Sequence, residues 1–168
     1  MRSMNIKPQD ILLAVHLLGD SKFRKQTEYA YELGMSQAEI STSLKRLSYA
    51  GLIDKVLLLP YKENLEEFLV HGLKYVFPAE YEEVGKGVPT AGSCSPLKEK
   101  MNSNGMPIVW RSKGGTVRGQ GLKPLFVSVP SIALKNSVLH ERLALIDAIR
   151  TGKPRERELA ISLFRGLA

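Results

Sequence analysis

The chain of 168 residues is long enough for one ordinary domain or two small ones, and it is 43% hydrophobic and 24% charged, as is normal for a globular protein. The longest apolar runs, residues 11–15 and 56–60, are far shorter than the roughly 20 residues that cross a bilayer. The N-terminus lacks the small-residue cleavage site of a secretory signal. The single cysteine, Cys94, excludes an internal disulfide and a cysteine-rich zinc site. We therefore expect a cytoplasmic protein with no membrane partner.

The formal net charge is +7, and it is unevenly distributed. Residues 63–84 are acidic, whereas residues 85–135 hold eight basic side chains and one acidic one. A basic surface favours polyanionic partners, above all nucleic acid, because each neutralised phosphate releases condensed counterions. The basic segment is as compatible with a solvated loop surface as with DNA contact.

The hydrophobic pattern predicts the α+β class, mainly helical. Helices are expected at residues 8–18, 27–33 and 36–50, where Pro8 can begin the first helix and Gly19, Gly34 and Gly51 can end each one. An extended apolar run follows at residues 52–59, and residues 64–75 have helical spacing. Two further helices are expected at residues 137–150 and 154–167.

The middle of the chain, residues 77–131, is predicted to be a small irregular α/β segment. Short apolar pieces at residues 107–110 and 125–129 favour strands. The glycine pairs at residues 85–87 and 114–115 lack the spacing of a phosphate-binding loop, so we interpret them as turns, and a further glycine-containing loop is expected at residues 119–121. We expect a domain boundary between residues 62 and 63.

The third predicted helix carries the clearest functional pattern. Ser36 and Glu39 have the spacing of a capping box, and Ile40, Leu44 and Leu47 form one apolar stripe. The opposite face has small polar and basic side chains. Three poor helix formers in succession, residues 41–43, need a reason other than helix stability, and contact with bases and phosphates supplies one.

These residues give the chain a family resemblance. Residues 8–59 resemble the winged helix-turn-helix domain of bacterial and archaeal regulators, especially the multiple-antibiotic-resistance-regulator type. The resemblance rests on Leu33-Gly34, Ser36-Gln37, Ile40-Ser41, Leu44-Lys45-Arg46-Leu47 and Gly51-Leu52-Ile53. It implies a sequence-specific regulator of transcription, such as a repressor, that binds double-stranded DNA, with this helix in the major groove.

The predicted DNA-binding residues divide into two groups. Gln37, Ser41, Thr42 and Arg46 are expected to reach bases, and Ser36, Ser43 and Lys45 are expected to hold phosphates. The family's wing is usually basic and contains glycine. Here residues 54–60 contain no glycine and little charge, so the wing is expected to be absent, short or buried.

One recognition helix contacts too few base pairs for useful specificity, so we expect a homodimer. Apolar residues of the two C-terminal helices, such as Leu143 and Ile146, either form its interface or close the core. Tyr29 and Tyr49 are expected to be packing residues.

Other functions remain open. One alternative is that the first domain is a winged helix that binds only protein. Another is that the whole chain is an antitoxin that regulates its own operon while residues 63–168 neutralise a toxin. An enzyme is the weakest alternative, because no nucleophile–base pair, carboxylate pair or metal-ligand cluster stands out. His16, His71 and His140 are isolated in sequence, so no metal or other cofactor is expected. RNA binding through the basic middle segment also remains open, although the sequence lacks the aromatic-rich sheet motif of common RNA modules.

Overall fold

The computed structural model describes residues 3–102 and 104–167, and the fold is α+β. The chain divides into two compact units, unit 1 (Met1–Phe68) and unit 2 (Leu69–Ala168). The division falls a few residues after the predicted boundary at 62/63, because the helix that begins at Lys62 continues past it. Within the described residues, none of the helices is both long enough and apolar enough to cross a membrane.

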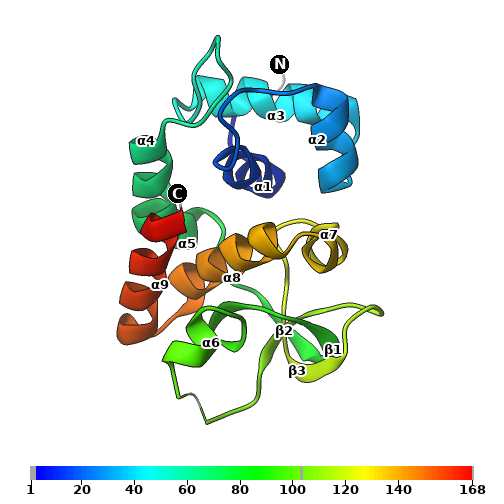
Figure 1. Ribbon diagram of the computed structural model, residues 1–168, viewed down its shortest axis with the longest axis vertical. Coiled ribbons are helices and arrows are strands. Elements are labelled where there is room, and N and C mark those ends of the chain that lie inside the picture. The colour runs from blue at the N-terminus through cyan, green and yellow to red at the C-terminus, as the bar shows by residue number, and fades with distance from the viewer. Residues whose placement is uncertain (1–2, 103, 168) are drawn as a thin grey trace. The chain divides into compact units, whose positions relative to one another are not determined.

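Unit 1 is built on three helices that contact one another, α1 (Pro8–Leu17), α2 (Gln26–Leu33) and α3 (Gln37–Tyr49). They are coloured blue to cyan in Figure 1. Each helix contributes aliphatic side chains to one core, among them Leu12, Val15, Leu33, Ile40 and Leu47. The three predicted helices are confirmed, with ends within a residue or two of the expected positions.

The predicted fourth helix is continuous but irregular. It consists of α4 (Lys62–Glu67), a π-helical turn η1 (Phe68–Gly72) and α5 (Leu73–Val76). Leu65, Leu69 and Leu73 are buried along one side, which agrees with the predicted apolar spacing. The π-helical turn coincides with the boundary between the two units.

Unit 2 contains a three-stranded sheet that closes on itself as a small barrel. β1 (Tyr81–Pro89) pairs antiparallel with both β2 (Ile108–Arg111) and β3 (Val117–Leu122), and β2 pairs parallel with β3. The strand expected at 107–110 is thus confirmed as β2. The strand expected at 125–129 is wrong, because residues 125–128 form a bend and turn that leads into α7 (Val129–Lys135).

The interpretation of residues 85–87 as a turn is also wrong, as is the loop expected at residues 119–121. Residues 85–87 lie within β1 and residues 119–121 within β3, whereas Gly114 lies in the turn after β2 and Gly115 directly follows it. A Cβ atom added at Gly87 would lie 2.1 Å from the carbonyl oxygen of Trp110, and one added at Gly115 would lie 2.1 Å from the carbonyl carbon of Gly87. Glycine is therefore required here for strands to approach closely.

Helices complete unit 2 around this barrel. η2 (Ala91–Ser93) and α6 (Leu97–Lys100) follow β1, and the chain ends in α8 (Ser137–Thr151) and α9 (Pro154–Leu167). α8 contacts α5, α7, α9 and η2, so it is buried on several sides, and it crosses near the strands in Figure 1. Leu143 and Ile146 are 2% and 0% exposed, which supports the interpretation that they close the core.

A buried carboxylate connects α8 to the barrel. The Asp147 side chain, 1% exposed, accepts hydrogen bonds from Thr90 Oγ1 at 2.7 Å and from Trp110 Nε1 at 2.8 Å. Arg150 Nη2 donates to its other oxygen at 2.9 Å. Burial raises the pKa of the Asp147 carboxyl, and the charge of Arg150 acts in the opposite direction. The network satisfies the buried carboxylate and links the helix to residues from β2 and the end of β1.

Replacing Asp147 should destabilise unit 2 strongly. Asp147→Asn leaves the Arg150 guanidinium buried without a counter-charge, so we expect a loss of about 3–5 kcal/mol in the free energy of unfolding. Thr90→Val removes only one donor, and the expected loss is about 1–3 kcal/mol. Urea denaturation followed by the fluorescence of Trp110, the only tryptophan, measures both. Equal losses in the two variants would contradict this account.

Candidate nucleic-acid interface

The connection between α2 and α3 is a three-residue turn. Gly34 ends α2 with φ 62° and ψ 36°, a left-handed conformation that suits glycine. The Met35 side chain is buried, and Met35 N–H donates to the Ala30 carbonyl oxygen at 3.0 Å. Ser36 then caps α3: its Oγ accepts from Glu39 N–H at 3.1 Å, and the Glu39 carboxylate accepts from Ser36 N–H at 3.4 Å. The predicted capping box is confirmed and fixes where α3 begins.

One face of α3 is accessible and has small polar side chains. Gln37 and Lys45 are exposed, and Ser41 and Thr42 are half-buried between them. Thr42 Oγ1 donates to the Ala38 carbonyl oxygen at 2.8 Å, which leaves the hydroxyl oxygen able to accept a further hydrogen bond. The predicted residues Ser36, Gln37, Ser41, Thr42 and Lys45 therefore lie on accessible parts of one helix and its cap.

Two predicted DNA-binding residues lie elsewhere. Arg46 is 5% exposed, and its Nε and Nη2 atoms each donate to the Asp10 carboxylate of α1 at 2.7 Å. Ser43 is 0% exposed and accepts from Arg46 Nη2 at 3.3 Å. The expectation that Arg46 reaches bases and Ser43 holds a phosphate is therefore wrong. Because α3 packs against both α1 and α2, the buried side of the helix includes these two polar residues as well as the apolar stripe.

After α3 the chain forms a very short hairpin. Its two sides meet in a single bridge between Ile53 and Pro60. The Asp54 carboxylate accepts from the N–H groups of Val56 and Leu57 at 2.8 and 2.6 Å and from the Tyr61 hydroxyl at 2.9 Å, and the two backbone hydrogen bonds lower its pKa most. These contacts order the hairpin without the strands of a full wing.

The tip of the hairpin, residues 55–58, is unusually apolar for a DNA contact. Val56 is 84% exposed and Leu57 is 65% exposed. Leu58 has φ 57°, a left-handed conformation that a leucine rarely adopts. Lys55 is the one charged side chain of this tip. Residues of this kind are more typical of a protein contact than of a minor-groove contact.

A hollow of about 550 Å³ lies beside α3 in unit 1. It is lined mainly by residues of α3 and the hairpin tip, with two contributions from the N-terminal segment and α2: Met4, Gln26, Ser41, Leu44, Lys45, Ser48, Tyr49, Lys55 and Leu58. Tyr49 is 74% exposed, so the expectation that it is a packing residue is wrong. The hollow gives the C-terminal half of α3 a mixed apolar and basic surface, which the sequence pattern did not indicate.

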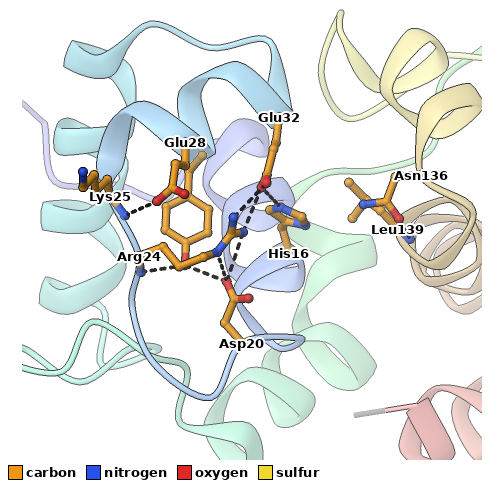
Figure 2. Close-up of polar contacts among 9 residues, drawn as sticks. His16, Asp20, Arg24, Lys25, Glu28, Glu32, Asn136 and Leu139 are labelled. Carbon is orange, nitrogen blue, oxygen red and sulfur yellow. Dashed lines mark hydrogen bonds and ion pairs between the residues drawn. The ribbon is translucent and has the colours of Figure 1, made fainter.

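A polar cluster fixes α2 against the end of α1 and the loop between them (Figure 2). The Arg24 guanidinium donates to both Glu32 oxygens at 2.8 Å and lies over the Tyr29 ring, 4.6 Å from its centre. The Tyr29 hydroxyl donates to Asp20 at 2.6 Å, and His16 Nε2 lies 2.7 Å from Glu32 Oε2. Tyr29 is 0% exposed, which confirms its predicted packing role. The cluster holds α2 in position to support α3.

Charge pairing in this cluster shifts two pKa values in opposite directions. The hydrogen bonds from Arg24 lower the pKa of Glu32 to about 2, and those to Glu32 raise the pKa of Arg24. Both side chains are partly exposed, at 36% for Glu32 and 30% for Arg24, so solvent weakens the attraction between them. The cluster is a structural support for α2 rather than a reactive site.

In unit 2 a cysteine and a histidine, residue types that can serve as nucleophile and base in an enzyme, lie close together. Cys94 Sγ lies 3.4 Å from His140 Nε2, but that nitrogen also lies 2.7 Å from the Pro89 carbonyl oxygen, to which it can only donate. Burial raises the pKa of the Cys94 thiol to about 12, so the thiolate is scarce at neutral pH. Among residues 3–102 and 104–167, no group of three or more His, Cys, Asp or Glu side chains is placed to hold a metal ion.

Comparison with known proteins gives no relative from which to transfer a function. No family model matches the chain, and neither a curated protein nor a solved structure matches it.

Removing Arg46 should destabilise unit 1 rather than act as the loss of a DNA contact. Arg46→Met leaves the buried Asp10 carboxylate without its counter-charge, and we expect a loss of about 3–5 kcal/mol. Far-ultraviolet circular dichroism in urea should report it, while the Trp110 fluorescence transition of unit 2 stays unchanged. Lys45→Met, at the exposed neighbouring position, is the control and should change stability little. A stable Arg46→Met variant would contradict the role of the pair.

Lowering the pH should reduce the free energy of unfolding of unit 1, because protonation of Glu32 removes its ion pair with Arg24. Because its folded pKa is lowered from 4.5 to about 2, its contribution is fully present above pH 4.5 and is lost as pH falls through about 2. In Glu32→Gln the free energy of unfolding should therefore depend less on pH across this interval. The control is Glu63→Gln, at an exposed position of α4. Parallel curves for the wild type and Glu32→Gln would refute the assignment.

Proposed function

We propose that the protein is a sequence-specific double-stranded DNA-binding regulator of transcription that acts in the cytoplasm. In this proposal α2, the Gly34 turn and α3 form a helix-turn-helix, and the hairpin at residues 53–60 is a much reduced wing. The observation that carries the proposal is the accessible face of α3, where Gln37, Ser41 and Thr42 offer amide and hydroxyl groups without bulk. A helix of this kind fits the major groove, where base edges present distinct donors and acceptors.

The proposed roles follow from the accessible positions. Gln37, Ser41 and Thr42 contact base edges; Lys45 and the Ser36 hydroxyl contact phosphates. Arg46 has a supporting role, since its pairing with Asp10 sets the rotation of α3 about its own axis. The polar cluster around Arg24 and Glu32 holds α2 against α1, so that the exposed face of α3 is presented on a rigid support.

A homodimer remains part of the proposal, because two recognition helices give the specificity that one lacks. Its interface is not formed by Leu143 and Ile146, since both are buried within unit 2. The exposed apolar tip of the hairpin, with Val56 and Leu57, is a better position for a contact between chains.

The same apolar tip supports a second candidate function. Together with Tyr49, Val56 and Leu57 form exposed apolar positions at one end of α3, and such exposure is typical of a protein-binding surface. We propose as the alternative an antitoxin-like module that regulates its own operon and neutralises a toxin. Both functions include binding to the upstream DNA, so a protein that co-purifies with the chain, or a toxin encoded by the neighbouring gene, distinguishes the alternative from the leading proposal.

Fluorescence anisotropy with the gene's own upstream region and with a scrambled duplex tests the leading proposal. We expect tighter binding to the upstream duplex. Gln37→Ala should lower that preference by about 5- to 150-fold, the equivalent of about 1–3 kcal/mol for a base contact. Lys45→Gln should weaken binding to both duplexes equally and lower the slope of log affinity against log salt by about 1.

Lys62→Gln, at an exposed position at the start of α4, is the matched control for lost charge in unit 1. Its binding should differ little from that of the wild type. Equal affinity of the wild type for the two duplexes, or an unchanged preference in Gln37→Ala, would count against sequence recognition by α3. Absence of binding to either duplex would count against both functions and would favour a module that binds only protein.

A further inference from the structure

A second basic surface lies on the barrel of unit 2, well separated in sequence from α3. A hollow of about 480 Å³ is lined by Glu82 and Lys86 of β1, Arg111 at the end of β2, and Ser112 and Lys113 of the following turn. Three of these five residues are cationic and one is acidic. We name this surface the barrel hollow.

The backbone of the barrel makes room for Arg111. A Cβ atom added at Gly85 would lie 2.8 Å from Arg111 Nε, and one added at Gly121 would lie 2.9 Å from Arg111 Cδ. The arginine stem therefore crosses two glycines, one from β1 and one from β3, at distances that a side chain there would obstruct. This arrangement places a guanidinium at the hollow, where its planar donors suit phosphate oxygens.

Among the residues that the structure describes, the positive charges at this surface have no polar partner. The side chains of Lys86, Arg111, Lys113 and Arg118 are exposed and form no hydrogen bond or ion pair with any residue in the described ranges 3–102 and 104–167. Lys86 and Arg118 are also directly opposite in the β1–β3 ladder, and like charges in that position destabilise a sheet. Lys123, just beyond β3, is by contrast paired with Glu80 at 3.3 Å.

We propose that the barrel hollow binds the phosphate backbone of double-stranded DNA without regard to sequence. Cations spread over several strands suit a polyanion, which can meet all of them and relieve the repulsion between Lys86 and Arg118. No aromatic ring lines the hollow among the described residues, whereas proteins that hold single strands stack bases on such rings. The choice of DNA as the polyanion rests on the proposed function; the phosphate contact itself is independent of α3.

The test is the salt dependence of binding of the full chain to the scrambled duplex. Each phosphate contact contributes about 0.9 to the slope of log affinity against log salt. The triple variant Lys86→Gln, Arg111→Gln, Lys113→Gln should lower the magnitude of the slope by about 2–3. The double variant Lys86→Gln, Lys113→Gln retains Arg111 beside Gly85 and Gly121, and it should lower the magnitude of the slope by about 2. Trp110 fluorescence in urea checks that unit 2 of each variant is folded.

The matched control removes three charges from other elements of unit 2, in Lys135→Gln, Lys153→Gln, Arg155→Gln. The inference is supported if the magnitude of the slope is smaller than that of the wild type in the barrel-hollow variants and unchanged in the control. Equal slopes in the folded double variant and the wild type overturn it, as does a wild type that binds no duplex at low salt. The ratio of affinities for upstream and scrambled duplexes separates this outcome from the role of α3, because the barrel-hollow variants should preserve that ratio.

Discussion

The ion pair between Arg46 and Asp10 determines which side of α3 is available for function. Both groups are buried, and two short hydrogen bonds join the guanidinium to the carboxylate. An apolar pair of similar volume would often give equal or greater stability, so the benefit of such a pair lies in geometry. An aliphatic contact tolerates rotation of the helix, whereas a bidentate pair tolerates very little. With Arg46 turned inward, Gln37, Ser41 and Lys45 are turned outward.

Unit 2 also contains a buried pair of a carboxylate and an arginine, but this pair has a different structural role. Asp147 is also buried beside an arginine, but its partners Thr90 and Trp110 come from the barrel side of the unit. The pair in unit 1 orients one helix on another, and the network in unit 2 attaches a helix to a sheet. Each unit thus has a buried polar connection in addition to its apolar core, which favours one arrangement of elements over the looser packings that an apolar core allows.

Structural features that depend on local sequence patterns could be predicted, whereas those that depend on contacts between residues distant in sequence could not. The caps and periodicity of α1, α2 and α3 are local, and their positions were predicted well. The burial of Arg46 depends on Asp10, which is 36 residues away in the sequence. The strands β1 and β3 were missed because their glycines suggest turns, although here those glycines let neighbouring strands approach.

The barrel also constrains how this sequence can change over evolutionary time. At Gly87, Gly115 and Gly119, an added methyl group would meet backbone atoms at 2.1 to 2.3 Å, and a backbone cannot rotate away as a side chain can. Substitution of these glycines therefore disrupts the fold, whereas the exposed cations between them can vary with little effect on folding. A sequence that keeps this barrel should therefore keep glycine at all three positions, even where the apolar residues around them differ.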